Sequence, residues 1–318
     1  MHRVLVTGAT GFVGRVVCAR LAAEGMAVRR VLHRGTSEAI SPDADILVEE
    51  IGPSTSWDRA LSGVDMVAHL AARVHVMRET AADPVAEFRR VNVQGTENLA
   101  RAAARAGVSR FVFVSTAKVN GEATRGRPFS ERDAPNPQDP YALSKWEAEQ
   151  MLAKVAAVTG LAVTVLRPPL VYGPGVKANF LSLLRAVDSG VPLPLSSISN
   201  LRSLVYVGNL VHALSACLTQ PAAANRTFFV SDDHDVSTPQ LIREIAAALG
   251  KKPLLFPFSP ALLRGAGLLT GRAEQIARLT GSLQVDVSSI KTALDWQPPF
   301  SLQQGLAQTV SWYRARSG

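Results

Sequence analysis

The chain has few cysteines, few aromatic residues and no long uncharged apolar run. Its two cysteines, Cys18 and Cys217, each lie in an apolar, helix-like stretch, and no Cys/His spacing of the zinc type occurs. We therefore expect two small buried side chains, with neither a disulfide nor a metal site. No stretch of about 20 uncharged apolar residues is present, so the sequence predicts no membrane span.

The charge of the chain narrows the class of partner. The net charge is +8, but the basic residues are scattered and aromatic residues amount to only 6%. Without a basic run or a base-stacking platform, nucleic acid is not an expected partner, and phosphorylated small molecules are favoured. Met1-His2-Arg3 leads directly into a predicted strand, which leaves no room for a signal peptide. We expect a reducing, cytoplasmic location.

The first half of the sequence alternates between strands and helices, which predicts a parallel sheet with helices on both faces. The predicted strands cover residues 4–6, 27–33, 45–48, 66–71, 110–115 and 161–166, and the predicted helices cover 12–24, 83–106 and 141–158. After Arg167, proline and glycine become dense and the alternation stops. We therefore divide the chain into residues 1–167 and a smaller mixed α/β lobe, 168–318, and expect segments near 203–235 to return to the first domain.

A glycine-rich loop separates the first strand from the first helix. It reads Thr7-Gly8-Ala9-Thr10-Gly11-Phe12-Val13-Gly14. Glycines at this point let the backbone turn tightly and approach a pyrophosphate, whose charge is met by the helix N-terminus. The order of strand, loop and helix predicts an α/β fold with a Rossmann-type doubly wound sheet. Its expected dinucleotide contacts are Gly8, Thr10, Gly11, Phe12, Val13 and Gly14.

The end of the second strand bears on the type of dinucleotide. An NAD site usually places an acidic residue there to bind the ribose 2′-hydroxyl. This chain instead has the run Arg29–Gly35, which contains no acid, and Arg34 is placed to pair with a 2′-phosphate. We therefore expect NADP(H) to be favoured over NAD(H). The alternative is that Arg34 is merely solvated and the site accepts both.

The candidate reacting groups are Thr116, Tyr141 and Lys145. Positions four apart on a helix share a face, so the Lys145 ammonium is expected to lower the pKa of the Tyr141 phenol. Thr116 follows the fifth strand, at the carboxyl edge of the sheet where ligands bind. Together these groups suit hydride transfer to or from a carbonyl. Tyr141 would handle the proton, and Lys145 would tune Tyr141 and hold the nicotinamide ribose.

Over its whole length the sequence resembles the extended short-chain dehydrogenases/reductases, in the NAD-dependent epimerase/dehydratase branch that acts on nucleotide sugars. The matching segments are Thr7–Gly14, Asp65–Ala72, Asn92 in Val-Asn-Val-Gln-Gly-Thr, Ser115-Thr116, Tyr141/Lys145, Arg167-Pro168 and Val171–Gly175. The resemblance implies that Ala71 lines the cofactor site and that Asn92 supports Lys145. It also implies that Asn179 approaches the diphosphate of a UDP-sugar and that Arg202 neutralises it. Members of this family often dimerise through a four-helix contact, so a homodimer is expected.

Arg73 and His75 follow the fourth predicted strand. They either face the sugar or form a polar loop rim, and the sequence favours neither reading. The apolar stretch 261–269 is expected to pack on the core as a helix of the second lobe rather than to lie on a membrane surface.

Departures from the family pattern bear on the reaction. Ala117-Lys118 stands where sugar 4,6-dehydratases have Asp-Glu, which argues against dehydration, and Asn120 replaces the tyrosine common in epimerases. The remaining pattern is most similar to O-antigen enzymes. This favours a 4-ketoreductase of a UDP-4-keto-6-deoxy-N-acetylhexosamine, giving a product of the UDP-N-acetylquinovosamine type. The alternatives are a UDP-hexose 4-epimerase, another carbonyl reductase and a non-catalytic NADP-binding regulator.

Overall fold

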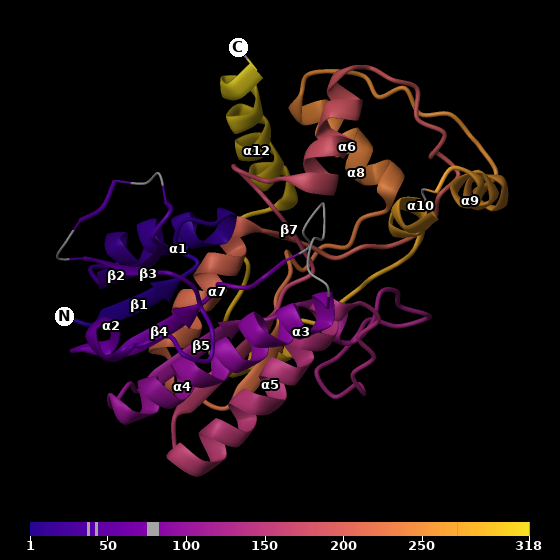
Figure 1. The fold of residues 1–318 in the computed structure, drawn as a ribbon. Coiled ribbons are helices and arrows are strands. Elements are labelled where there is room, and N and C mark those ends of the chain that lie inside the picture. Colours follow the sequence, from indigo (N-terminus) through magenta and orange to yellow (C-terminus); the bar gives the residue numbers. More distant parts are fainter. Residues whose placement is uncertain (37–38, 42–43, 75–82, 272, 318) are drawn as a thin grey trace.

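The computed structural model describes residues 1–36, 39–41, 44–74, 83–271 and 273–317. Its centre is a seven-stranded sheet with the order β3-β2-β1-β4-β5-β6-β9, in which every neighbouring pair is parallel. The strands are β1 (Arg3–Thr7), β2 (Ala27–His33), β3 (Asp45–Val48), β4 (Met66–His69), β5 (Arg110–Val114), β6 (Ala162–Arg167) and β9 (Arg226–Phe229). The predicted parallel α/β architecture is confirmed (Figure 1).

Helices cover both faces of this sheet because each central strand is apolar on both sides. In β1, Val4 and Val6 belong to a core shared with α1 (Phe12–Ala23) and α7 (Val207–Thr219). Leu5 between them points into a second core, shared with α4 (Gly95–Arg105) and α5 (Pro140–Thr159). Side chains of a strand alternate between the faces, so three consecutive buried residues require a covering layer on each side.

The end of β4 shows how local chemistry stops a strand. The sequence predicts strand up to Ala71, but β4 ends at His69. The Thr7 hydroxyl at the end of β1 accepts hydrogen bonds from the amides of Leu70 and Ala71, both at 3.2 Å. These two amides therefore cannot continue the ladder to the neighbouring strand.

The helix predicted over residues 83–106 is not continuous. It consists of α3 (Pro84–Phe88), a π-helical turn η1 (Arg89–Gln94) and α4. Asp83 begins it, because its carboxylate accepts a hydrogen bond from the Ala86 amide at 3.0 Å. A π-helical turn holds one residue more per turn than an α-helix and is common at functional sites. The buried Asn92 lies in this turn.

The smaller lobe is built around the parallel pair β7 (Leu170–Tyr172) and β8 (Leu204–Tyr206). Its helices include α6 (Ala178–Asp188), α8 (Thr238–Ala248), α9 (Pro260–Leu269), α10 (Ala273–Thr280) and α12 (Leu302–Ser317). Helix α11 (Ser288–Leu294) contacts β9 of the main sheet. Three short elements, α2 (Asp58–Leu61), η2 (Ala117–Val119) and η3 (Pro221–Ala223), complete the described secondary structure. Helix α7 follows β8 directly and packs beside α1, while β9 joins the edge of the main sheet.

Helix α9 lies at the outer edge of this lobe, beside α10 (Figure 1). The sequence predicts that residues 261–269 pack on the core. In the structure only Gly267 of this helix is fully buried, and Leu263 is its partly buried contact with the core. Among the described residues, no helix is both long and apolar enough to cross a membrane.

Candidate active site

The glycine loop adopts a conformation that only glycine permits. Gly8 has φ +68°, and a Cβ on it would lie 2.8 Å from the amide nitrogen of Ala71. A Cβ on Gly14 would lie 2.0 Å from the Gly8 carbonyl oxygen. The two glycines therefore let the loop fold onto the start of α1 and bring it against Ala71.

The same loop fits the diphosphate of a dinucleotide. Gly11 is the N-cap of α1, and no described side chain caps the helix or places a negative charge in its first turn. A Cβ on Gly11 would meet only the Gly8 carbonyl oxygen. A helix N-terminus with exposed amides and a partial positive charge is a site for a phosphate group. The carbonyl oxygen of Thr10, within this loop, accepts a hydrogen bond from Arg15 Nε at 3.0 Å.

Beside Arg34, just after the end of β2, the structure places an acidic residue that is not close to Arg34 in the sequence. Arg34 forms an ion pair with Glu49, which directly follows β3, with 3.4 Å between Nη1 and Oε1. Both side chains are exposed. The expected preference for NADP(H) assumed that Arg34 has no acidic neighbour. Because Glu49 supplies one, this basis for preferring NADP(H) is weaker, and the preference stays a prediction.

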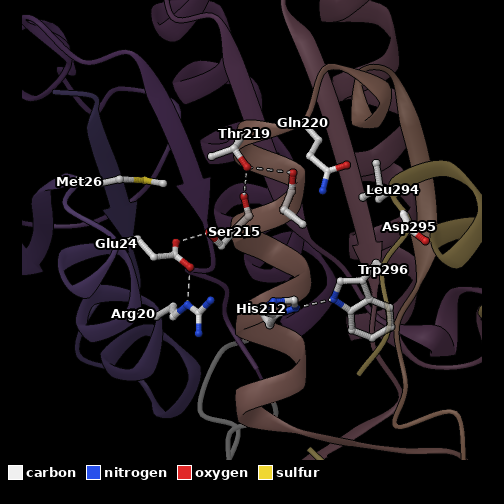
Figure 2. Close-up of a pocket in the computed structure, with 11 residues that line it drawn as sticks. Arg20, Glu24, Met26, His212, Ser215, Thr219, Gln220, Leu294, Asp295 and Trp296 are labelled. Atoms are coloured by element: carbon white, nitrogen blue, oxygen red, sulfur yellow. Dashed lines mark hydrogen bonds and ion pairs between the residues drawn. The ribbon is translucent and has the colours of Figure 1, made fainter. Parts of the chain in front are cut away.

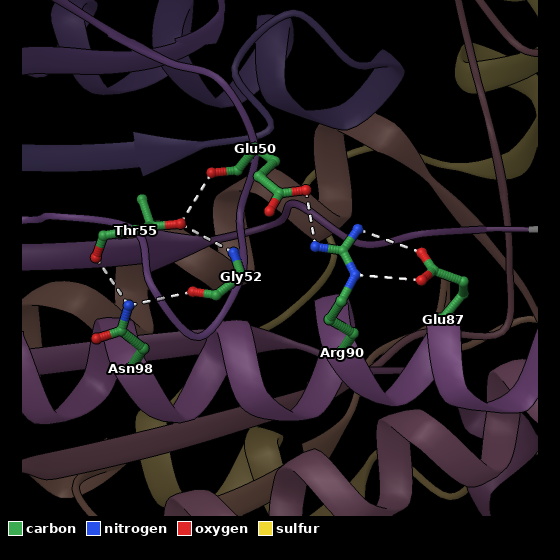
Figure 3. Close-up of polar contacts among 6 residues, drawn as sticks. All are labelled: Glu50, Gly52, Thr55, Glu87, Arg90 and Asn98. Carbon is green, nitrogen blue, oxygen red and sulfur yellow. Dashed lines mark hydrogen bonds and ion pairs between the residues drawn. The ribbon is translucent and has the colours of Figure 1, made fainter.

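The loop that carries Glu49 is held by the helix beside it (Figure 3). Arg90 in the π-turn donates to Glu50 at 2.7 Å and to Glu87 at 3.2 Å. The Asn98 amide donates to the carbonyls of Gly52 and Thr55, at 3.1 and 2.8 Å. These contacts tie residues 50–55 to η1 and α4, and so restrict the position of the adjacent Glu49.

Helix α5 carries the candidate acid/base. Asp139 caps it by accepting a hydrogen bond from the Ala142 amide at 2.6 Å, and Pro140 occupies its first position. Tyr141, Lys145 and Glu149 follow at intervals of four, so they share one face. This face turns toward the carboxyl ends of β5 and β6, as the contacts of Glu149 with Ser115 and Arg167 show.

The pKa values of this face depart from the expectation. The sequence predicts that Lys145 lowers the pKa of Tyr141. Burial instead raises the pKa of Tyr141 to about 12, with a further increase from Asp139. Burial lowers the pKa of Lys145 to about 7, although Glu149 opposes this. Desolvation of the buried phenolate is the larger of the two causes of the Tyr141 shift.

The Lys145 ammonium lies over an aromatic floor. Its Nζ is 3.9 Å from the centroid of the Phe113 ring, a cation–π contact. On Phe113 stacks His69, with 5.6 Å between centroids and 24° between planes. Burial and the nearby Lys145 lower the pKa of His69 to about 3, so the imidazole is neutral.

Two threonines hold this imidazole. The hydroxyl of Thr7 lies 2.6 Å from His69 Nδ1, and that of Thr96 lies 2.9 Å from Nε2. Since the Thr7 oxygen already accepts two backbone amides, its proton is available for Nδ1, which leaves Nε2 to donate to Thr96. The glycine loop, β4 and the floor under Lys145 are therefore joined.

A buried ion pair fixes the inner end of the same face. Glu149 accepts from the Arg167 guanidinium, with Nε 3.1 Å from Oε1, and also from the Ser115 hydroxyl. Arg167 Nη1 donates to the Asn120 side chain at 2.9 Å. Both ionised side chains are about 95% buried. Removing one partner of such a pair would leave an uncompensated buried charge, so these contacts lock α5 against β5 and β6.

Asn92 connects the π-turn to α5. Its side-chain nitrogen donates to Ser144 Oγ at 2.9 Å and to the carbonyl of Arg73 at 3.0 Å. Its oxygen accepts from the Arg73 amide at 2.8 Å. Asn92 thus contacts the residue next to Lys145 on the helix and the loop after β4, and its support of Lys145 stays a prediction. The Arg73 guanidinium lies over the Phe88 ring, 5.7 Å from its centroid, while His75 lies outside the described residues.

Two cavities meet at the candidate catalytic groups. The smaller, of about 210 Å³, is lined by Val13 of the glycine loop and by Lys145. The larger, of about 550 Å³, extends into the second lobe. Thr116 and Tyr141 line both. A cofactor ring on one side and a substrate on the other would therefore meet beside these two hydroxyls.

The larger cavity brings together the predicted diphosphate contacts. Asn179 lines it at the start of α6, directly after Ala178, whose φ of +52° is in the left-handed region. Arg202 lines it as well, and its Nη1 donates to the carbonyls of Arg278 and Gly281, at 2.9 and 3.1 Å. Part of the Arg202 guanidinium therefore holds α10 in place, in addition to facing the cavity.

Several lining residues were not predicted from the sequence. Arg278 and Gln275 reach the larger cavity from α10. Burial lowers the pKa of Arg202, and the charge of Arg278 adds to this effect. A substrate with two negative charges would be matched by two guanidiniums in one cavity. No local motif marks α10, so only the fold of the second lobe could have indicated it.

Lys118 is the other residue whose role the structure shows. It lines the larger cavity and forms ion pairs with Glu122 at 2.7 Å and with Asp139 at 2.8 Å. Asp139 is the cap of α5 and one cause of the raised pKa of Tyr141. Lys118 thus links the wall of the cavity to the start of the helix that bears Tyr141.

A third cavity, of about 330 Å³, lies between α1, α7 and the segment after α11 (Figure 2). It shares no lining residue with the other two. Its polar groups bind one another: Arg20 and Ser215 donate to Glu24, and Trp296 Nε1 donates to His212 at 2.9 Å. The described residues contain no group of three or more His, Cys, Asp or Glu that could hold a metal ion, and no disulfide joins Cys18 to Cys217.

Fold and site together define a dinucleotide-dependent enzyme of the nucleotide-sugar type. The model of the NAD dependent epimerase/dehydratase family matches residues 4–230, and the chain belongs to this family. A UDP-glucose 4-epimerase of Vibrio cholerae is 44% identical over 311 residues, which cover 96% of this chain and 94% of that protein.

Two further relatives are similar over nearly the whole chain. An N-acetyl-alpha-D-glucosaminyl-diphospho-ditrans,octacis-undecaprenol 4-epimerase of Escherichia coli O157:H7 is 27% identical, with 97% of this chain and 94% of that protein covered. The solved structure of MoeE5 in complex with UDP-glucuronic acid and NAD has a TM-score of 0.77 at 27% identity, with 99% of both chains covered. The protein is thus an enzyme of a family that acts on nucleotide sugars.

The glycine loop provides a first test. Gly14→Ala is expected to abolish measurable binding of NAD(H), because the new Cβ would overlap the Gly8 carbonyl and push the loop from the helix N-terminus. Gly265→Ala is the matched control, since nothing lies within 4 Å of a Cβ there, and it should keep full binding. Fluorescence titration with NADH measures both. Unchanged binding by Gly14→Ala would contradict the assigned role of the loop.

The buried ammonium should weaken the fold. With the pKa of Lys145 lowered from 10.5 to about 7, the unfolded chain binds more protons than the folded one between these pH values. Stability therefore rises with pH across this window, and below it the whole cost of burying the charge is present.

We expect Lys145→Met to raise the free energy of unfolding by about 2 kcal/mol at pH 7 and to lose turnover. The gain should shrink as the pH approaches 10.5, where the wild-type lysine is neutral in both states. Lys154→Met, at an exposed position of the same helix, should change neither quantity. Urea denaturation at several pH values measures this. A destabilised Lys145→Met at pH 7 would show that the ammonium contributes more through its contacts than its burial costs.

The Arg34–Glu49 pair predicts how the cofactor preference responds to charge. Arg34→Asp should move the preference towards NADH, and Glu49→Gln should move it towards NADPH by about tenfold, since a carboxylate would no longer repel the 2′-phosphate. Glu50→Gln is the control, because Glu50 pairs with Arg90. The measured quantity is the ratio of the dissociation constants for NADPH and NADH. If neither Arg34→Asp nor Glu49→Gln alters it, these residues do not face the ribose.

Proposed function

We propose that the protein transfers hydride at C4 of a UDP-sugar, as a 4-epimerase. The observation that carries the proposal is the meeting of the two cavities at Thr116 and Tyr141. The similarity to the Vibrio cholerae protein supports 4-epimerisation in particular. On the sequence alone, 4-epimerisation is the alternative to net reduction. The similarity to the Vibrio cholerae protein makes 4-epimerisation the better supported of the two.

The glycine loop and the smaller cavity support binding of the dinucleotide between them. Gly8, Gly11 and Gly14 would hold the diphosphate at the start of α1, and Ala71 would line the same side. Lys145 and Tyr141 line the smaller cavity, where the nicotinamide ring would lie. When bound, NAD accepts a hydride from a carbinol carbon and can return it.

Tyr141 and Thr116 would act on the oxygen at C4. Thr116 donates a hydrogen bond that positions this oxygen. Tyr141, in its phenolate form, takes the proton of this oxygen as the carbon becomes a ketone and returns it afterwards. Lys145, one turn further along α5, provides a positive charge that favours the phenolate whenever it forms. Asn92 and the Glu149–Arg167 pair fix the helix and have no contact with the substrate in this scheme.

Epimerisation also requires that the sugar present both faces to the cofactor. The walls of the larger cavity are mainly apolar, with leucines from α6, α10 and the loop after α6, and they offer few fixed polar contacts to hold one face. Arg202, Arg278 and Asn179 would retain the diphosphate while the sugar turns. The wide cavity and the anchored diphosphate thus support a reaction in which the hydride returns from the opposite face.

Net reduction of a 4-keto sugar is the second candidate. It is favoured by Lys118 and Asn120, which differ from the residues of typical dehydratases and epimerases at these places. Asn120 is held by Arg167 and buried, so it cannot serve as the tyrosine that it replaces. A place in O-antigen biosynthesis and a preference for NADP(H) belong to this second reading.

Two assays distinguish the candidates. Under the proposal, purified protein interconverts UDP-GlcNAc and UDP-GalNAc, or UDP-glucose and UDP-galactose, without net consumption of NADH or NADPH, as followed by NMR. Under the alternative, it consumes NADPH with a UDP-4-keto-6-deoxy-N-acetylhexosamine, as followed by absorbance. Tyr141→Phe should lower either rate by at least about 100-fold and leave cofactor binding intact. Reduction without any epimerisation would overturn the proposal.

A further inference from the structure

The second lobe exposes a group of large apolar side chains along one edge. They are Leu254, Phe256, Phe258, Leu262, Leu268 and Leu269, and we call them the α9 patch. Leu268 and Leu269 are 73% and 91% exposed, and Leu262 is 64% exposed. A group of exposed leucines and phenylalanines on neighbouring segments of a folded protein marks a contact with a partner.

The patch forms one surface because of how its segments run. Leu193 pairs with Leu255 as a β-bridge, and the chain then passes through Phe256 and Phe258 into α9. Helix α9 packs closely on α10, where a Cβ on Gly267 would lie 2.6 Å from Ile276. One side of α9 is thereby used within the lobe, whereas Leu262, Leu268 and Leu269 are exposed. The helix itself lies at the outer edge of the lobe (Figure 1).

The chain segment that carries the patch contains basic residues and no acidic ones. Residues 245–273 contain Lys251, Lys252, Arg264 and Arg272 but no Asp or Glu, although the chain as a whole has 26 acidic residues in 318. At that frequency, about two acids would be expected in these 29 residues. Lys252 and Arg264 are exposed. Lys251 is paired with Asp188, whereas the exposed Lys252 and Arg264 place two further cations beside the leucines and phenylalanines of the α9 patch.

We propose that the α9 patch docks onto an anionic membrane surface. Side chains of leucine and phenylalanine flanked by Lys and Arg are the composition of segments that lie in the headgroup region of a bilayer. The apolar tips enter the boundary between headgroups and acyl chains, and the cations approach the lipid phosphates. The contact is peripheral and needs no membrane-spanning helix.

A second copy of this chain is a poorer partner for the same surface. In a symmetric dimer each patch would meet itself, so Lys252 and Arg264 would face like charges, and segment 245–273 has no acidic residue to compensate them. An anionic lipid surface meets the apolar and the basic groups at once. The charge pattern therefore selects the membrane.

Docking would set the orientation of the larger cavity. Gln275, Arg278 and Leu279 of α10 line this cavity, and α10 is the helix on which α9 packs. The two guanidiniums of the cavity would thus lie one helix away from the lipid surface. The inference concerns the docking surface alone and goes beyond the proposed reaction, so it stands whether the enzyme is an epimerase or a reductase.

Binding to vesicles tests the proposal. Wild-type protein should co-sediment with vesicles of phosphatidylcholine and phosphatidylglycerol, less with phosphatidylcholine alone, and less again at high salt. Leu268→Ser/Leu269→Ser should weaken binding at least about tenfold, because two inserted leucines are lost. Lys252→Gln/Arg264→Gln should weaken binding to the anionic vesicles in particular. Val158→Ser, at a position of α5 that is also 73% exposed, should bind as wild type does.

Each outcome decides the matter. No binding of the wild type to anionic vesicles, or equal binding by the leucine variant, overturns the proposal. A concentration-dependent dimer that the leucine variant abolishes, seen by light scattering without vesicles, overturns it in favour of self-association. Circular dichroism checks that the variants are folded; if the leucine variant is not, the Lys252/Arg264 pair of substitutions decides by the same criterion. The rate with a water-soluble UDP-sugar should be unchanged, so a failure of the proposed reaction is distinguishable from a failure of docking.

Discussion

The structure depends on one costly arrangement, the burial of a charged helix face against the carboxyl ends of the sheet. Tyr141, Lys145 and Glu149 share this face, and Lys145 is buried deeply enough that its pKa falls to about 7. Such a face is stable only if its remaining charge is compensated. Arg167 compensates Glu149, and the Phe113 ring lies under the ammonium. Burying this face lowers the stability of the fold, but it keeps the phenol of Tyr141 and the positive charge of Lys145 at fixed positions.

The surrounding elements serve to hold that face in place. The π-turn directs Asn92 to Ser144 on α5 and Arg90 to the loop after β3. Thr7 ends β4 and, through His69, joins the glycine loop to the aromatic floor. A displacement of any of these elements would move the reacting groups relative to the cofactor loop. The links of Asn92 to Ser144 and of Thr7 to His69 are hydrogen bonds between buried groups, so breaking either would leave an unsatisfied polar atom, which makes the arrangement stiff.

The second lobe is built in another way. Its larger cavity has mainly apolar walls, and Arg202 and Arg278 reach it from separate elements of this lobe. The lobe thus supplies a cation pair for a diphosphate and leaves the sugar loosely surrounded. Its outer edge is apolar and basic. A rigid catalytic face and a permissive substrate lobe fit a family in which the same hydride chemistry serves several nucleotide sugars.

The sequence by itself determined the parallel sheet, the glycine loop and the grouping of Thr116, Tyr141 and Lys145. These features depend on local rules: strand and helix periodicity, the backbone freedom of glycine, and the spacing of four along a helix. The tertiary structure alone decided that Glu49 meets Arg34, that Arg278 joins Arg202, and that residues 83–106 contain a π-turn. It also reversed the expected direction of the Tyr141 pKa. Each of these depends on burial or on contacts between residues far apart in the chain, and neither can be read from neighbouring residues.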